Sequence, residues 1–125
     1  MAGKRIFISF ALEDTHYRDL LKAQSLNTVL PFSYTDMPEK DFDNLAWQTN
    51  CRTRIRGCDG VIVLLSKKTE KDEATKYEIR CAVEEDIPIL GVYVRKERCN
   101  VPYQLNRKKV IDWDWEEIAE FIDSL

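Results

Sequence analysis

Five consecutive aliphatic residues, Val61 to Leu65, are the feature that most limits what this chain can fold into. An unbroken apolar run of this length is typical of a strand that is buried on both faces. Such strands occur mainly in parallel sheets that carry helices on both sides. The run therefore predicts the centre of a parallel sheet.

Strand-like and helix-like patterns alternate along the rest of the chain. Further strands are predicted over 5–10 and 88–94, with a short edge strand at 109–111. Residues 31–34 are predicted as a strand mainly from their place in the alternation. The expected fold class is therefore α/β: a doubly wound parallel sheet of four to five short strands with helices on both faces.

Four segments have the 3.6-residue spacing of amphipathic helices. Asp14 is predicted to cap the first helix, and Gly57 or Gly60 is predicted to end the second. The third helix is predicted over 73–85, and Asp114 is predicted to cap the fourth. The inward-facing positions predicted for the four helices are Tyr17, Leu20 and Leu21; Trp47, Cys51, Ile55 and Cys58; Ile79, Ala82 and Val83; and Ile118, Phe121, Ile122 and Leu125.

Length and charge exclude several classes of protein. A chain of 125 residues with 44% apolar residues suits one domain spanning 1–125. The net charge of −3 argues against a broadly basic nucleic-acid binder. No apolar run is long enough to span a membrane, and the first residues lead into a strand rather than a signal peptide. We expect a cytoplasmic protein that binds neither nucleic acid nor membrane.

The cysteines do not have the spacing of a metal site. Cys51, Cys58, Cys81 and Cys99 contain no CxxC pair, and His16 is the only histidine. We expect no metal site and interpret the four cysteines as buried free thiols.

Candidate ligand-binding residues follow from the predicted sheet. In open parallel sheets, ligands bind beyond the carboxyl ends of the strands, near the point where the strand order reverses. This rule selects the residues after the first strand, Asp36 to Lys40 after the second, and Ser66 after the third. Neither GxGxxG nor a P-loop motif is present. The patternless segments 35–43 and 95–108 are expected to be surface loops.

Glu78 differs from the other acidic residues of the third predicted helix. On a helical wheel it flanks the apolar arc of Ile79, Ala82 and Val83, nearer the core than Glu84 or Glu85. We expect it to be half-buried near the carboxyl ends of the strands. A solvated carboxylate at the helix edge is the alternative.

Several segments, taken in order, resemble a Toll/interleukin receptor (TIR) domain. They are Arg5 to Phe10, Phe42 before a helix, Asp59 to Ser66, and Lys76-Tyr77-Glu78-Ile79 before an apolar strand. The resemblance covers about residues 4–95 and is strongest to the small bacterial TIR-like proteins of the Thoeris anti-phage system. It implies a flavodoxin-like, TIR-like fold.

The resemblance also implies an activity: hydrolysis or cyclisation of NAD, as substrate rather than cofactor, to a nucleotide signal for an effector protein in phage defence. Glu78 matches the catalytic glutamate of the family. Cleavage of the nicotinamide–ribose bond passes through an oxocarbenium-like state, which a carboxylate stabilises. Because nicotinamide leaves from a cationic pyridinium and needs no proton, one carboxylate suffices.

Other positions carry over from the same resemblance. Ser9, Phe10, Ala11 and Leu12 would line the pocket floor, and Phe42 would stack on a base or act as a hydrophobic staple. Ser66 would donate to a ribose or cap its turn. Segment 36–43, beginning at Asp36, matches the BB loop, through which copies of the chain would assemble so that one loop completes a neighbour's site.

Two departures from the family pattern leave other functions open. Ala74 stands where many TIR enzymes have Trp, and the loop has Pro38 but no glycine. A non-catalytic interaction module, with the loop and an exposed Tyr77 as its assembly surface, is therefore the alternative. A nucleoside deoxyribosyltransferase is a further enzymatic alternative. A phosphoryl-receiver domain is disfavoured because Ser66 occupies the position of the required Asp.

Overall fold

The computed structural model describes residues 3–26, 32–37, 39–95 and 99–125. Its centre is a parallel sheet of five strands in the order β2-β1-β3-β4-β5. The strands are β1 (Lys4–Ser9), β2 (Phe32–Thr35), β3 (Gly60–Leu65), β4 (Ile89–Tyr93) and β5 (Lys109–Asp112). The predicted doubly wound parallel sheet is confirmed, including the weak second strand, although Pro31 lies outside the described residues.

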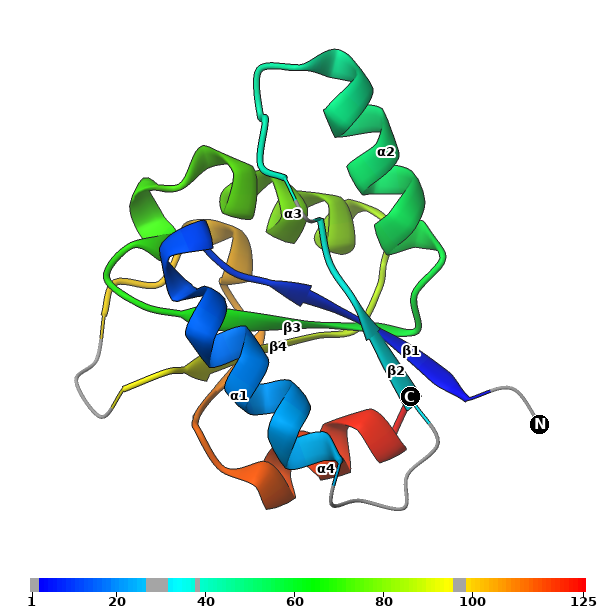
Figure 1. Ribbon diagram of the computed structural model, residues 1–125, viewed down its shortest axis with the longest axis vertical. Coiled ribbons are helices and arrows are strands. Elements are labelled where there is room, and N and C mark those ends of the chain that lie inside the picture. The colour runs from blue at the N-terminus through cyan, green and yellow to red at the C-terminus, as the bar shows by residue number, and fades with distance from the viewer. Residues whose placement is uncertain (1–2, 27–31, 38, 96–98) are drawn as a thin grey trace.

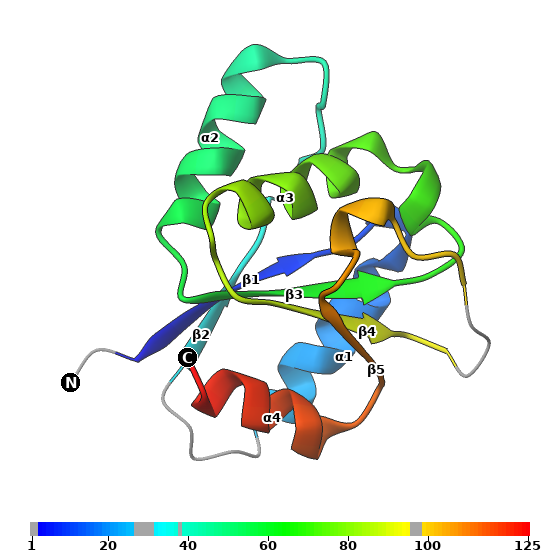
Figure 2. The same cartoon turned by 180° about the vertical axis from the view of Figure 1, so that it is seen from behind.

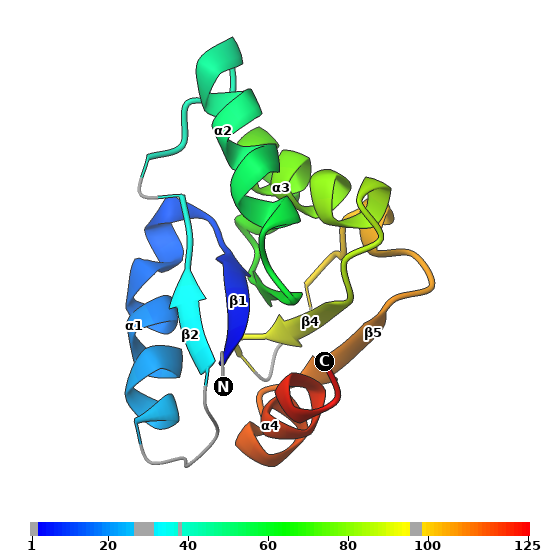
Figure 3. The same cartoon turned by 90° about the vertical axis from the view of Figure 1, so that its right-hand side faces the viewer.

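Four helices cover the two faces of the sheet (Figure 1). They are α1 (Thr15–Ser25), α2 (Leu45–Arg56), α3 (Glu73–Glu84) and α4 (Trp115–Asp123). Helices α2 and α3 lie on one face, and α1 and α4 lie on the other (Figures 2 and 3). Among the described residues, no helix is long and apolar enough to span a bilayer.

The central strand β3 divides the core into two layers. Its residues alternate between the faces, so Val61, Val63 and Leu65 pack with α2 and α3, whereas Ile62 and Leu64 pack with α1 and α4. All six residues of β3 are buried, as the aliphatic run predicts. At its start, a Cβ added to Gly60 would lie 2.6 Å from a methyl group of Leu125, so glycine allows the C-terminal residue to pack there.

The helix stripes are largely confirmed. Trp47, Cys51, Ile55 and Cys58 are all buried, and α2 ends at Gly57. In α1 the prediction is wrong for Leu20, which is 50% exposed. Only Leu21 of that stripe is fully buried. The stripes of α3 and α4 are buried at Ile79, Ala82, Ile118 and Ile122 and half-buried at Val83, Phe121 and Leu125.

Two expectations for smaller features need correction. The segment 95–108 is not only surface loop, because Tyr103–Leu105 forms a helical turn that buries Leu105. The four cysteines are free, but Cys99 is only half-buried. The other three are buried as predicted.

Candidate functional site

A cavity of about 720 Å³ opens beyond the carboxyl ends of β1, β3 and β4. The strand order reverses between β1 and β3, so the cavity lies where ligands bind in open parallel sheets. Its volume falls within the roughly 300–1,000 Å³ of pockets that hold small molecules. Its wall includes Leu12, Asp14, Tyr17, Lys40, Ser66 and Arg95.

Glu78 is fully buried beside this cavity. It lies in the second turn of α3, and its carboxylate accepts a 2.7 Å hydrogen bond from the Ser9 hydroxyl at the end of β1. The ammonium of Lys40 lies 2.7 Å from Oε1 and 2.6 Å from Oε2. The expectation of a half-buried Glu78 is therefore corrected: a cation and a hydroxyl inside the protein replace the water that a half-buried carboxylate would keep.

Burial dominates the acid–base behaviour of this carboxylate. It raises the pKa of Glu78 to about 7, while the charge and hydrogen bonds of Lys40 and the hydrogen bond of Ser9 act in the opposite direction. Glu78 therefore loses its proton only near neutral pH, because Lys40 and Ser9 offset only part of the effect of burial on its pKa.

Lys40 separates Glu78 from the cavity. The Lys40 side chain is 3% exposed and lines the cavity, whereas Glu78 is not among the described residues that line it. The Lys40 ammonium also lies 4.9 Å from the centroid of the Phe10 ring, within the range of a cation–π contact. A molecule in the cavity would meet Lys40 before it reached Glu78.

Lys40 lies in the range 36–40 that was predicted to reach the ligand site, but no role was predicted for its side chain. One signal could have found it: a buried carboxylate requires a cation, and Lys40 is the only basic residue in the segment 36–43. The expectation that this segment is a surface loop holds only in part, because Met37 and the Lys40 side chain are buried; Pro38 lies outside the described residues.

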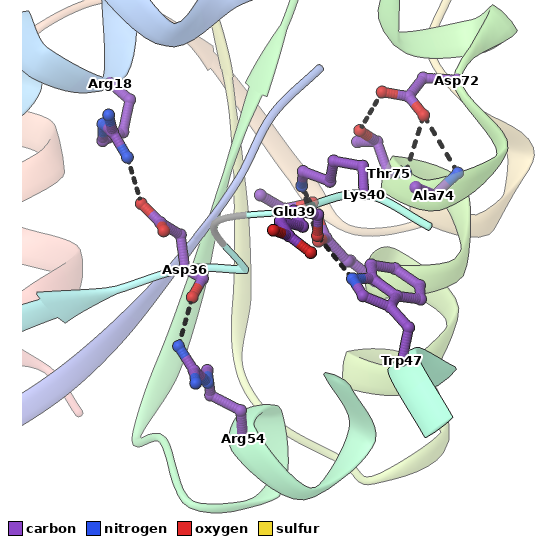
Figure 4. Close-up of polar contacts among 11 residues, drawn as sticks. Arg18, Asp36, Glu39, Lys40, Trp47, Arg54, Asp72, Ala74 and Thr75 are labelled. Carbon is purple, nitrogen blue, oxygen red and sulfur yellow. Dashed lines mark hydrogen bonds and ion pairs between the residues drawn. The ribbon is translucent and has the colours of Figure 1, made fainter. Parts of the chain in front are cut away.

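The same segment is anchored at two further points (Figure 4). Asp36 forms a 2.7 Å ion pair with Arg18 of α1, and its carbonyl accepts a hydrogen bond from Arg54 of α2. The indole N–H of Trp47 donates to the carbonyl of Glu39. Trp47 is thus a core residue that also holds the loop, whereas Asp36 is placed outside the cavity wall.

Asp14 lies at the N-cap position of α1, as predicted, but its side chain has a different role. Its side chain makes no capping hydrogen bond at the start of α1, so the prediction of a side-chain cap is wrong. The carboxylate accepts a hydrogen bond from the Ser66 hydroxyl instead, and both residues line the cavity. Ser66 also shapes its turn, because its N–H donates to Thr69 and its oxygen accepts from the N–H of Lys68.

The remaining predicted site residues are placed unequally. Leu12 lines the cavity and is 45% exposed. Phe10 and Ala11 are buried, and neither is among the described residues of the cavity wall. Phe42 packs edge-on against Tyr77, with ring centroids 5.8 Å apart, and is likewise outside the wall. Tyr17, which sequence patterning assigned only to helix packing, does line the cavity, next to His16.

Tyr77 is half-buried rather than exposed. Its ring also contacts Trp47, with centroids 6.0 Å apart, and the guanidinium groups of Arg52 and Arg80 lie 6.0 and 5.9 Å from its centroid. The prediction of an exposed assembly residue is therefore wrong, because the Tyr77 side chain packs against α2.

The residues that match a known family include the site. The family model described as Thoeris protein ThsB, TIR-like domain, matches residues 7–98, from β1 through α3 and β4. The chain belongs to this family. The matched segment contains both Glu78 and Lys40 of the TIR-like domain.

Solved structures agree with this TIR-like fold. The TIR domain of the Toll-related receptor TRR-2 from Hydra magnipapillata superposes with a TM-score of 0.70 at 19% identity, covering 94% of this chain and 97% of that one. A prokaryotic SEFIR domain superposes with a TM-score of 0.59 at 15% identity, covering 98% and 89%. No curated protein matches this chain in sequence.

Proposed function

We propose that the chain is an NAD-consuming enzyme, an NAD glycohydrolase or ADP-ribosyl cyclase, with Glu78 as the catalytic carboxylate. It would produce a nucleotide signal that reaches an effector protein in bacterial anti-phage defence. The observation that carries the proposal is the position of Glu78: a buried carboxylate at the carboxyl ends of the strands, next to a cavity of small-molecule size. Membership of the Thoeris TIR-like family supports the same activity.

The proposed reaction breaks the bond between C1′ of the ribose and the pyridinium nitrogen of NAD. Nicotinamide leaves with the bonding electron pair as a neutral molecule, so no acid is needed. The ribose carbon acquires oxocarbenium character, and the Glu78 carboxylate stabilises this positive charge. Water then adds to C1′ and releases a proton to give ADP-ribose, or a nucleophilic group of the same nucleotide adds to give a cyclic product.

Binding of the substrate would replace one cation by another. In the free protein, Lys40 neutralises Glu78 and lies over the ring of Phe10. The nicotinamide ring of NAD is itself cationic and planar, so it could take the place of the ammonium against the carboxylate and the aromatic face. The buried ion pair must open before the reaction, and we propose that contact of the loop 36–43 with a neighbouring copy of the chain favours this opening.

Glu78→Gln tests the proposal, because it removes the charge and keeps the shape. We expect the rate of NAD cleavage to fall about a thousandfold, the scale expected when a preorganised charge beside the reacting centre is lost. The assay is chromatography of NAD incubated with concentrated protein or with lysate of phage-infected cells. Circular dichroism checks that each variant is folded, since Glu78→Gln leaves Lys40 without its partner.

Glu84→Gln is the matched control, because Glu84 is an exposed carboxylate on the same helix that pairs with Arg52. We expect it to leave the rate unchanged. Equal product from the wild type and Glu78→Gln would remove Glu78 from the mechanism.

One observation favours a second candidate, the non-catalytic assembly module. The Lys40 ammonium contacts both carboxylate oxygens of Glu78, so this ion pair can serve as an internal tie that holds the loop in one conformation. A protein that assembles but leaves NAD intact under all the conditions above would support this function.

A further inference from the structure

The cavity has a second buried carboxylate that the proposed cleavage does not use. Asp14 is 4% exposed, follows β1 directly and lines the cavity at the reversal of strand order. A buried carboxylate is costly unless hydrogen-bond donors satisfy it. The hydrogen-bond donors that the protein does not provide to Asp14 therefore indicate which groups its ligand must supply.

Ser66 fixes the orientation of this carboxylate. The Ser66 hydroxyl donates to Oδ2 of Asp14, while its oxygen accepts a 3.1 Å hydrogen bond from the N–H of Lys68. The single proton of the hydroxyl is thus committed to Asp14. Within the described part of the chain, no other hydrogen-bond donor to the Asp14 side chain is recorded, although a carboxylate accepts about four.

The cavity combines this acceptor with a basic rim. An ionised carboxylate can only accept, so the ligand group beside Asp14 must carry O–H or N–H donors. Lys68 and Lys71 are exposed on the wall of the same cavity, which suits phosphate oxygens. A ligand with a vicinal diol next to phosphate satisfies both features, and a ribose with its 5′-phosphate is such a group.

We propose that Asp14, positioned by Ser66, binds the 2′- and 3′-hydroxyls of the adenosine ribose and thereby selects NAD over NADP. The inference rests on the proposed function, because Glu78 is assigned to the nicotinamide ribose and Asp14 takes the other one. A phosphate at the adenosine 2′ position would remove one donor and place a doubly charged anion against a buried carboxylate.

The test uses the reaction product, so that it does not depend on cleavage. ADP-ribose and its 2′-phosphate are titrated into the wild-type protein, and binding is measured by calorimetry or NMR shifts. We expect ADP-ribose to bind at least ~10-fold more tightly, because a site built around a buried polar group strongly disfavours a ligand that leaves it unpaired. Equal affinities, or no binding of either compound, would overturn the inference.

Three variants separate selection by Asp14 from other effects. Asp14→Asn keeps the shape and still accepts from Ser66, and we expect it to reduce the preference for ADP-ribose to about threefold or less as the repulsion is lost. Glu120→Gln removes an exposed carboxylate of α4 that does not line the cavity and should keep the preference. Ser66→Ala should weaken binding of ADP-ribose but leave the 2′-phosphate disfavoured, because the carboxylate remains. A preference unchanged in Asp14→Asn contradicts the inference.

The two proposals can fail separately. Glu78-dependent cleavage of NAD without a preference governed by Asp14 would reject only the selection of the ribose. Selective binding of ADP-ribose by a protein that never cleaves NAD would reject only the proposed reaction.

Discussion

At the scale of single residues, the pair of Lys40 and Glu78 determines what the site can do. The Lys40 ammonium contacts both carboxylate oxygens, and both side chains are almost completely shielded from water. In such surroundings the loss of one partner is far more costly than its exchange for another cation. The site therefore favours a positively charged ligand group at Glu78 over a neutral one.

The raised pKa of Glu78 predicts how stability depends on pH. The folded protein keeps the proton of Glu78 up to about pH 7, whereas the unfolded chain releases it near the ordinary value of 4.5. Between these values the folded state binds more protons, so the stabilisation is complete below the lower value and is lost as the pH rises through about 7, with a slope of up to ~1.4 kcal/mol per pH unit.

Urea denaturation of the wild type and Glu78→Gln from pH 4 to 8 measures this effect. We expect the free energy of unfolding of the wild type, relative to that of the variant, to decrease across this range. A constant difference would mean that the folded state does not raise the pKa of Glu78.

The sequence located some of these residues and not others. Glu78 could be found because the helical wheel places it at the flank of the apolar arc and the family resemblance matches it to a glutamate of the third helix. Lys40 and Asp14 could not be placed by periodicity, since their positions depend on how a loop and a helical turn pack against distant residues. Asp14 has the side chain of a helix cap, but the hydroxyl of Ser66, 52 residues away in sequence, is its partner instead.

At the scale of elements, a side-chain cap fixes the start of α3, the helix that carries Glu78. The Asp72 carboxylate accepts from the N–H groups of Ala74 and Thr75 and from the Thr75 hydroxyl (Figure 4). Ala74, the position where many TIR enzymes have Trp, is buried and therefore faces the protein interior.

Loss of this cap should destabilise the protein. We expect Asp72→Ala to lower the free energy of unfolding by about 1 kcal/mol, because two N–H groups of the first turn lose their acceptor. Asp72→Asn, which still caps, should retain most of the stability. Urea denaturation of both variants is the measurement, and equal losses would show that charge at this position, rather than capping, stabilises the helix.

The elements themselves were largely predictable from the sequence. The buried strands β3 and β4 and the stripe of α2 follow from local patterns that tertiary packing does not overrule. Their ends differ by a residue or two, because helix and strand ends depend on caps. Helix α3 ends at Glu84 rather than at the predicted Glu85, and Asp86 has a left-handed conformation (φ 56°).

At the scale of the whole molecule, the loop 36–43 connects the site with the outer surface. It is tied to α1 through Arg18, to α2 through Arg54 and Trp47, and to α3 through Lys40. Asp41, next to Lys40, is exposed. A second copy of the chain that contacts this exposed part could therefore shift the ion pair inside.

This arrangement predicts that activity depends on association. We expect the rate of NAD cleavage per molecule to increase with protein concentration, in the same range where light scattering detects association, because a neighbour helps to displace Lys40. Asp41→Arg should shift both curves to higher concentration by reversing a charge in the contact. Glu120→Arg, an exposed reversal on α4, should shift neither; a fully active monomer would reject the role of assembly.

The division of the core by β3 has a consequence for how such a chain can change over time. Residues on the side of α1 and α4 share few neighbours with those on the side of α2 and α3, so substitutions in the two layers should be close to additive. One layer can accumulate mutations while the other keeps the carboxylate in place. Phe10 and Tyr17 of the α1 and α4 layer contact the site, so directed evolution for thermal tolerance should begin at Ile118 and Ile122 of α4, which do not line the cavity.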